Sequence, residues 1–136
     1  MIRQTRQGAL HMLVLDRAAR ANALTEAMLR DLTARLAAIA GAEPRAVVIT
    51  GEGRVFSAGA DLAEAAQGLA QSDAWVALSK QLAAMPCLTI AALNGTLAGG
   101  AFGMALTCDL RIAVPEAQFF YPVMRLGYQP PEGDPE

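Results

Sequence analysis

Backbone amide groups beside a pair of glycines are the first feature of this sequence that could do chemistry. In residues 89–109, an apolar run is followed by a turn at Asn94-Gly95 and then by Gly99-Gly100. We expect a strand, a tight turn, and a helix at residues 101–107 that is entered through glycine. The first amides of a helix lack intrahelical partners and can hold a carbonyl oxygen that gains negative charge. The glycine pair could equally serve only to pack the helix closely on a sheet.

A second segment with free amides is expected at residues 55–62, VFSAGADL. Small residues and a glycine lie here between an aromatic and an acidic residue, which indicates irregular backbone ending at a helix. Amides freed in such a segment can bind a ligand. Asp61 is well placed to cap the helix, which is also its ordinary structural role.

The remaining candidate side chains carry weaker indications. Arg17 and Arg20 could contact the phosphates of a ligand, although two arginines in a loop are usually only solvated. His11 is the only histidine, and no nucleophile close in sequence needs it, so we expect a structural role. Cys87 and Cys108 fit no metal or redox spacing and are expected to be reduced packing residues. We predict no metal site.

Composition and charge limit the class of protein. The 136 residues fit one domain, 54% of them are hydrophobic, and the formal net charge is -2. Interspersed charges exclude a nucleic-acid-binding patch and a polybasic membrane anchor, so the expected partners are small molecules or protein subunits. The first residues lack the apolar core of a secretion signal, and no later apolar run can span a bilayer. We therefore expect a cytoplasmic protein with a single domain over residues 1–136.

The elements that would position these segments alternate between strands and helices. Two short strands are expected in residues 1–16, with a turn at Gln7-Gly8. Thr25 is the expected N-cap of an amphipathic helix at residues 26–39. Further strands are expected at residues 45–51, 88–93 and 110–114, a short extended piece at 118–121, and an interrupted helix at 64–84. This alternation predicts an α/β domain with parallel strands.

Several separated pieces of the sequence occur together in one known family. They are RANAL at residues 20–24, VVITG at 47–51, FSAGADL at 56–62, and the stretch 86–127. Within that last stretch the glycine pair, Cys108-Asp109, Ala117-Gln118-Phe119, Pro122 and Leu126-Gly127 all keep the family's order and spacing. The chain thus resembles the enoyl-CoA hydratase/isomerase family, also called the crotonase family. Several motifs in register are far more specific than one glycine pair.

What this resemblance implies is an α/β spiral of ββα turns that binds acyl-CoA thioesters. In the family two backbone N–H groups hold the thioester oxygen, and their positions match Ala60 and Gly100. Coenzyme A is then part of the substrate, with no permanently bound cofactor, and a homo-oligomer, either trimer or hexamer, is expected. The residues implied to contact the substrate are Arg20, Ala58, Ala60, Asp61, Leu62, Gly100, Gly103 and Val123.

The sequence departs from the family at the two positions that carry the catalytic glutamates. These positions hold Gly103 and Val123, and neither side chain can carry a proton. The two-glutamate hydration mechanism is therefore not expected here. Glu132 is a possible relocated acid or base, although an exposed acidic loop is its favoured role. Glu64 and Tyr121 are further candidates.

Three functions stay open at this point. The leading hypothesis is an acyl-CoA-binding protein of hydratase/isomerase descent that stabilises a thioester enolate. The second is a non-catalytic acyl-CoA-binding or scaffold subunit, and the third is another reaction of the same fold, such as decarboxylation or thioester hydrolysis. Family members usually continue through further helices. We therefore expect a truncated N-terminal core whose exposed apolar surface drives self-association.

Overall fold

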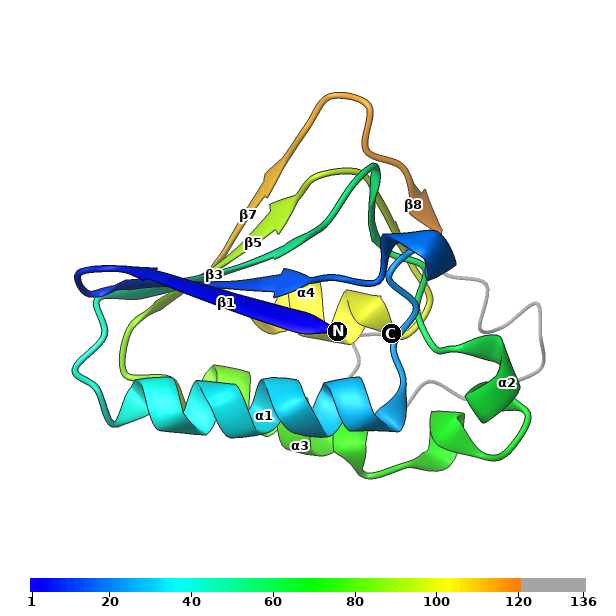
Figure 1. The fold of residues 1–136 in the computed structure, drawn as a ribbon, viewed down its shortest axis with the longest axis horizontal. Helices are drawn as coiled ribbons and strands as arrows, with labels where there is room; N and C mark the ends of the chain where they lie inside the picture. The colour runs from blue at the N-terminus through cyan, green and yellow to red at the C-terminus, as the bar shows by residue number, and fades with distance from the viewer. Residues whose placement is uncertain (121–136) are drawn as a thin grey trace.

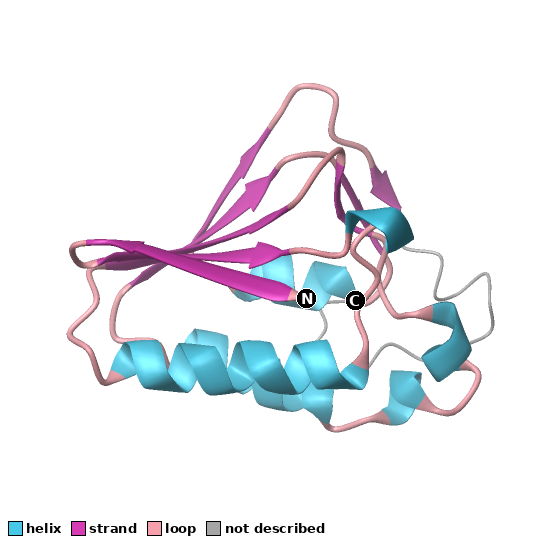
Figure 2. Cartoon of the chain, in the orientation of Figure 1, coloured by secondary structure: helices cyan, strands magenta, loops and turns pink. Residues whose placement is uncertain are grey.

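The computed structural model describes residues 1–120 and arranges them as two sheets and a layer of helices (Figure 1, Figure 2). The larger sheet has the strand order β1-β2-β3-β5-β7 and the smaller sheet the order β4-β6-β8. Helices α1 (Glu26–Ala40) and α3 (Ala74–Ala83) pack against each other along one face of the larger sheet. The strands are β1 (Ile2–Gln7), β2 (Leu10–Leu15), β3 (Ala46–Gly51), β4 (Val55–Ser57), β5 (Leu88–Leu93), β6 (Thr96–Ala98), β7 (Leu110–Ala113) and β8 (Phe119–Phe120).

Two turns of the chain, β3–β4 and β5–β6, visit both sheets before the chain continues into a helix, whereas β1 and β2 both lie in the larger sheet. Strands β3 and β4 lead into α2 (Leu62–Ala65), the 3-10 helix η2 (Leu69–Gln71) and α3, whereas β5 and β6 lead into α4 (Ala101–Thr107). Apart from the antiparallel β1–β2 hairpin, the paired strands run parallel. The predicted α/β fold with a ββα spiral is confirmed, although the sequence itself shows no repeat.

Helix α1 supplies the main apolar layer beneath the sheet. Its N-cap Thr25 accepts a hydrogen bond from the Met28 amide at 3.1 Å, which confirms the expected cap. One face of the helix is buried in the core at helical spacing, through Met28, Leu29, Leu32, Leu36 and Ile39. Fully burying one such side chain contributes about 1.5–3 kcal/mol, so this face stabilises the fold more than the cap does.

The interrupted helix expected at residues 64–84 is confirmed as three short pieces. Gly68 separates α2 from η2 and has a φ of +99°, which glycine adopts without strain. Ser72 then separates η2 from α3. The indole N–H of Trp75, in the first turn of α3, donates to the Leu69 carbonyl oxygen at 2.9 Å. This bond fixes the orientation of the buried Trp75 ring.

Two strands of the smaller sheet differ from the sequence-based expectation. Strand β4 occupies a segment expected to be irregular, and β6 occupies the expected short link between turn and helix. Each strand has three residues, which is too short to show an alternating pattern. Each forms because it pairs with the other across a large sequence separation, a tertiary effect that local propensity does not reveal.

Within the described residues no helix is long and apolar enough to cross a membrane. The same residues contain no group of three or more His, Cys, Asp or Glu side chains that could hold a metal ion.

Gly95, at the turn between β5 and β6, has no room for a side chain. A Cβ at this position would overlap the Arg54 carbonyl oxygen, and the β3–β4 turn would have to move. We therefore expect Gly95→Ala to lower the free energy of unfolding by about 3 kcal/mol, measured by urea denaturation.

Gly8→Ala is the matched control for this prediction. Gly8 has a φ of +60° but nothing within 4 Å of an added Cβ, so its replacement costs only the backbone strain of about 1 kcal/mol. Equal losses of stability in the two variants would contradict the overlap at Gly95.

Candidate active site

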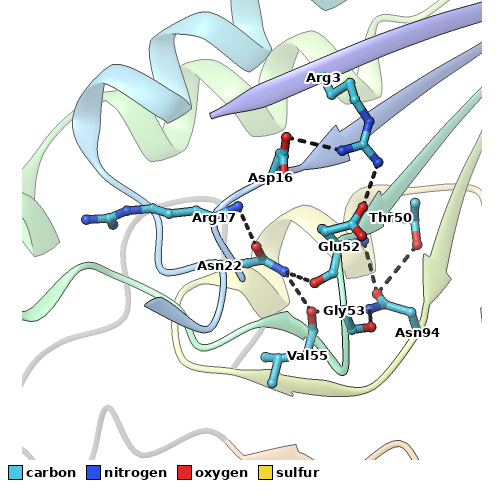
Figure 3. Close-up of polar contacts among 10 residues, drawn as sticks. Arg3, Asp16, Arg17, Asn22, Thr50, Glu52, Gly53, Val55 and Asn94 are labelled. Carbon is cyan, nitrogen blue, oxygen red and sulfur yellow. Dashed lines mark hydrogen bonds and ion pairs between the residues drawn. The ribbon is translucent and has the colours of Figure 1, made fainter. Parts of the chain in front are cut away.

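Two asparagine side chains hold the turn that connects the two sheets (Figure 3). The first, Asn22, is buried, and its Nδ2 donates to the carbonyl oxygens of Glu52 at 3.0 Å and Val55 at 2.8 Å. Its Oδ1 accepts a hydrogen bond from the Arg17 amide at 2.9 Å. The side chain of Asn22 therefore ties the start of the loop at residues 17–24 to the β3–β4 turn.

Asn94 holds the same turn from the end of β5. Its Oδ1 accepts from the Gly51 amide at 3.0 Å, and its Nδ2 donates to the carbonyl oxygens of Gly53 at 2.9 Å and Val55 at 3.2 Å. The Val55 carbonyl thus accepts from both asparagines. Because polar groups removed from water are costly unless paired, this network favours a single conformation of the turn from which residues 58–61 emerge.

The main chain of Leu24 determines how Ala60 is presented. The Leu24 amide donates to the Gly59 carbonyl oxygen at 2.7 Å, and the Asp61 amide donates to the Leu24 carbonyl oxygen at 2.8 Å. This is a one-residue parallel bridge between Leu24 and Ala60. In such pairing, the bonded groups belong to the residues on either side of Ala60, so the Ala60 N–H points away from Leu24.

The second glycine-containing segment lies directly against the first. A Cβ on Gly59, whose φ is +96°, would stand 2.9 Å from the Ala98 carbonyl oxygen and 3.2 Å from the Gly100 nitrogen. Only glycine permits this approach, because a real Cβ does not tolerate such distances to main-chain atoms. Gly99 also has a positive φ, of +60°, and its amide donates to the Phe120 carbonyl oxygen at 2.9 Å.

Trp75 packs beneath the Gly100 backbone. A Cβ on Gly100 would come within 2.9 Å of the ring atom Cη2 and 3.0 Å of Cζ3. The ring is held in turn by its bond to Leu69. Gly100 therefore lacks a side chain because the indole occupies that space, which supports the Gly100 peptide from the side of α3.

No hydrogen bond among residues 1–120 uses the amide of Ala60 or that of Gly100. The two predicted donors thus lie on segments in direct contact, and neither donor is occupied within the described chain. Two backbone amides stabilise an oxyanion where both donate to the same oxygen.

Asp61 caps α2, as expected, and is also held by an arginine. Its Oδ1 accepts from the Glu64 amide at 3.1 Å, and its Oδ2 lies 2.9 Å from Nη1 of Arg17. These two interactions, the backbone hydrogen bond first, lower the pKa of the Asp61 carboxyl group. Arg17 is therefore not a solvated loop residue, and this interpretation of the sequence was wrong because the partner lies far along the chain.

The other residues predicted to contact the substrate differ in how exposed they are. Arg20 ends the 3-10 helix η1 (Ala18–Arg20) with an exposed side chain that makes no hydrogen bond or ion pair within residues 1–120. Ala58 is exposed and Leu62 is 81% exposed, whereas Gly103 is buried inside α4. Three further candidates, Tyr121, Val123 and Glu132, lie outside the described residues.

Glu64 has a structural partner that its sequence position does not reveal. Its Oε1 accepts from the Glu26 amide at 2.8 Å, at the first residue of α1, where a carboxylate is favoured by the helix dipole. Glu64 and Glu26 also line an open cavity of about 350 Å³ together with Gln67, Gly68 and Leu69. A capping role therefore accounts for Glu64 better than solvation alone.

The cysteines and the histidine show no sign of catalytic chemistry. Burial raises the pKa of the Cys108 thiol to about 11, so the thiol stays protonated and unreactive at neutral pH. Cys87 is partly buried and also free. His11 is buried in β2, and neither of its ring nitrogens has a hydrogen-bond partner within residues 1–120.

Three functional supports were not identified from the sequence: Asn22, Leu24 and Trp75. Asn22 and Leu24 fall within the matching piece RANAL, which was a signal for their importance but not for their roles. Trp75 lies within the helix expected at residues 64–84, but no sequence pattern connects it with Gly100. Their roles depend on contacts with residues that are distant in sequence.

Comparison with known proteins agrees with this fold. Residues 5–134 match the family model described as enoyl-CoA hydratase/isomerase. The chain therefore belongs to the enoyl-CoA hydratase/isomerase family, which confirms the resemblance drawn from the motifs.

Individual proteins also match the chain over most of its length. Probable enoyl-CoA hydratase echA6 of Mycobacterium tuberculosis is 35% identical over 127 residues, which cover 93% of this chain and 52% of that protein. The 2,3-dehydroadipyl-CoA hydratase of Escherichia coli is 38% identical over 133 residues, covering 95% and 52%. A solved structure of AtuE from Pseudomonas aeruginosa matches with a TM-score of 0.85 at 31% identity, covering 93% of this chain and 53% of that chain. The chain spans about half the length of the curated relatives it matches.

The Asp61 carboxylate should make folding stability depend on pH. Because its pKa is lower in the folded protein than in the unfolded chain, its contribution is present above about pH 4 and is lost as the pH falls through the folded-state value. We expect Asp61→Asn to flatten the acid limb of unfolding free energy against pH, measured by urea denaturation. An acid limb unchanged from the wild type would contradict this assignment.

Proposed function

We propose that this chain binds acyl-CoA thioesters and stabilises the enolate form of the thioester through the amides of Ala60 and Gly100. The supporting observation is the direct contact between residues 58–61 and 98–100, each of which carries an amide unused within residues 1–120. Membership of the enoyl-CoA hydratase/isomerase family supports acyl-CoA as the substrate class. Coenzyme A would then arrive with the substrate.

The proposed chemistry needs two donors and no particular side chain at either position. Loss or gain of a proton at the α-carbon of a thioester develops negative charge on the thioester oxygen. Preorganised amides stabilise that charge without reorganisation, and removing one such donor typically costs about 3 kcal/mol. Because main-chain donors tolerate side-chain change, this part of a site can persist when the acids and bases have diverged.

Among residues 1–120, no side chain is assigned to move the proton. Gly103 has no side chain and lies buried in α4. Two-glutamate hydration is therefore not part of this proposal. Glu132 stays the candidate relocated acid or base, and Glu132→Gln should lower any turnover severely if it has that role.

A second candidate function is a non-catalytic acyl-CoA-binding or scaffold subunit. The glycine at position 103 favours this function. Such a subunit would keep the amides of Ala60 and Gly100, here called the cradle, without the acidic side chain at position 103. Decarboxylation or thioester hydrolysis remains an alternative that needs a polar group near the acyl chain. The expected cytoplasmic location and the homo-oligomer, trimer or hexamer, remain predictions.

The proposal can be tested without knowing the proton-transfer residue. Acetoacetyl-CoA has an acidic α-carbon, and its enolate has a distinct near-ultraviolet absorbance. We expect the enolate band of bound ligand to appear at lower pH than that of free ligand, by about two pH units if the cradle supplies about 3 kcal/mol. Bound ligand that titrates at the same pH as free ligand would contradict the proposal.

Removing one donor tests the assignment of the amides. Ala60→Pro deletes the Ala60 N–H but none of the bonds that Leu24 makes to Gly59 and Asp61. We expect most of the titration shift to disappear in this variant. Unchanged affinity for coenzyme A alone and an intact thermal transition serve as controls for folding. A full shift in folded Ala60→Pro would exclude the Ala60 amide as a donor.

Gly100→Pro removes the other donor but is a less selective test. The ring of the introduced proline would collide with Trp75, because a Cβ at this position already lies within 2.9 Å of the indole. We expect this variant to lose both the shift and folding stability, with calorimetry separating the two effects.

Hydration of crotonyl-CoA should not exceed the uncatalysed rate. The reaction needs a group that activates water, and position 103 offers none. Loss of the crotonyl-CoA absorbance in the presence of the protein would show a base at another position, and Glu132→Gln would then be the first variant to compare.

A further inference from the structure

We infer that Arg17 is a positioning residue for the proposed cradle: it fixes the segment that presents the Ala60 amide and cancels the charge of the neighbouring Asp61. This inference rests on the proposed function, because it concerns the same amide. It goes beyond that function by assigning a role to an ion pair outside the two glycine-containing segments.

Arg17 contacts both of the segments that meet at the Leu24–Ala60 bridge. One nitrogen of Arg17, Nη1, lies 2.9 Å from Asp61 Oδ2 and also donates to the Ala23 carbonyl oxygen at 2.9 Å. Ala23 precedes Leu24, and Asp61 follows Ala60. The guanidinium group therefore joins the same two segments that the Leu24–Ala60 bridge joins, directly beside that bridge.

Arg17 is itself held in position through its main chain. Its amide donates to Asn22 Oδ1 at 2.9 Å, and Asn22 is buried in the network that holds the β3–β4 turn. The side chains of Arg17 and Asp61 are only 21% and 15% exposed. The pairs of Arg3 with Asp16 and Glu52 and of Arg30 with Asp73 also connect separate segments, but their side chains are all at least 45% exposed. Arg35–Asp31 lies within one turn of α1.

The positive charge of Arg17 also balances the negative charge of Asp61. Asp61 directly follows Ala60, so an unpaired carboxylate there would oppose negative charge at an oxygen held by the Ala60 amide. Arg17 neutralises this carboxylate, and partial burial keeps water from screening the pair fully. The nearby Glu64 carboxylate is directed to the Glu26 amide, and Arg20 is exposed without a partner among residues 1–120, so Arg17 is the cation paired with Asp61.

Charge replacement separates this role from a merely structural one. In Arg17→Gln the Asp61 carboxylate is left unpaired, so we expect the enolate band of bound acetoacetyl-CoA to move up in pH by about one unit, a tenfold loss of enolate stabilisation. In Asp61→Asn the asparagine can still cap α2, but Arg17 is left with its positive charge. We expect that variant to move the band down in pH.

Opposite directions in the two variants are the diagnostic result. A structural role alone predicts that both replacements loosen the segment and move the band toward the value for free ligand. A shift of the band to lower pH in Asp61→Asn is informative even if Arg17→Gln folds poorly. Arg17→Lys keeps the positive charge, so its titration shift should lie closer to that of the wild type than the shift of Arg17→Gln does.

Arg35→Gln is the matched control. It removes an arginine that also pairs with an aspartate, on the middle of α1, and should leave the titration of the bound ligand unchanged. The inference would be overturned if Arg17→Gln showed the same titration shift as the wild type, or if Arg17→Gln and Asp61→Asn moved the enolate band in the same direction. Either result would leave the proposed function standing. Absence of any shift in the wild-type protein would instead overturn the proposed function.

Discussion

The close approach of Gly59 to the Gly99–Gly100 peptide is the constraint on which the rest of the site depends. These residues belong to consecutive turns of the spiral, which follow β4 and β6, and the pairing of those two short strands brings them together. A side chain on Gly59 would force the segments apart by pressing on the Ala98 carbonyl oxygen. Backbone contact without side chains between them is therefore what places the Ala60 and Gly100 amides near one another.

The polar network around this contact gives each segment a separate support. Asn22 and Asn94 fix the turn that leads into residues 58–61, and Leu24 brackets Ala60 from one side. Trp75 occupies the space where a side chain of Gly100 would lie. Most of these contacts are made by neutral groups that are paired and shielded from water, so they hold geometry with little sensitivity to salt. A site that stabilises transient charge requires such preorganisation.

Most of the secondary structure could be predicted from the sequence, because it follows from local patterns. The apolar spacing and the Thr25 cap located α1, and an interrupted helix was expected where α2, η2 and α3 lie. The contacts that build the site could not be derived in this way. The pairing of β4 with β6, the Arg17–Asp61 ion pair and the hydrogen bond that Glu64 accepts from α1 each join residues far apart in the chain. Motif resemblance supplied the two amide positions, but the chain alone did not show what supports them.

The most direct test of the central claim is the infrared spectrum of an acyl-CoA labelled with ¹³C at the thioester carbonyl, recorded free and bound to the protein. Hydrogen bonds from two amides polarise the carbonyl group and weaken its double bond, so the account predicts a lower stretching frequency in the bound state. Ala60→Pro should return the frequency most of the way to the free value. A carbonyl stretch unchanged by binding to the wild-type protein would contradict the assignment of Ala60 and Gly100 as donors to the thioester oxygen.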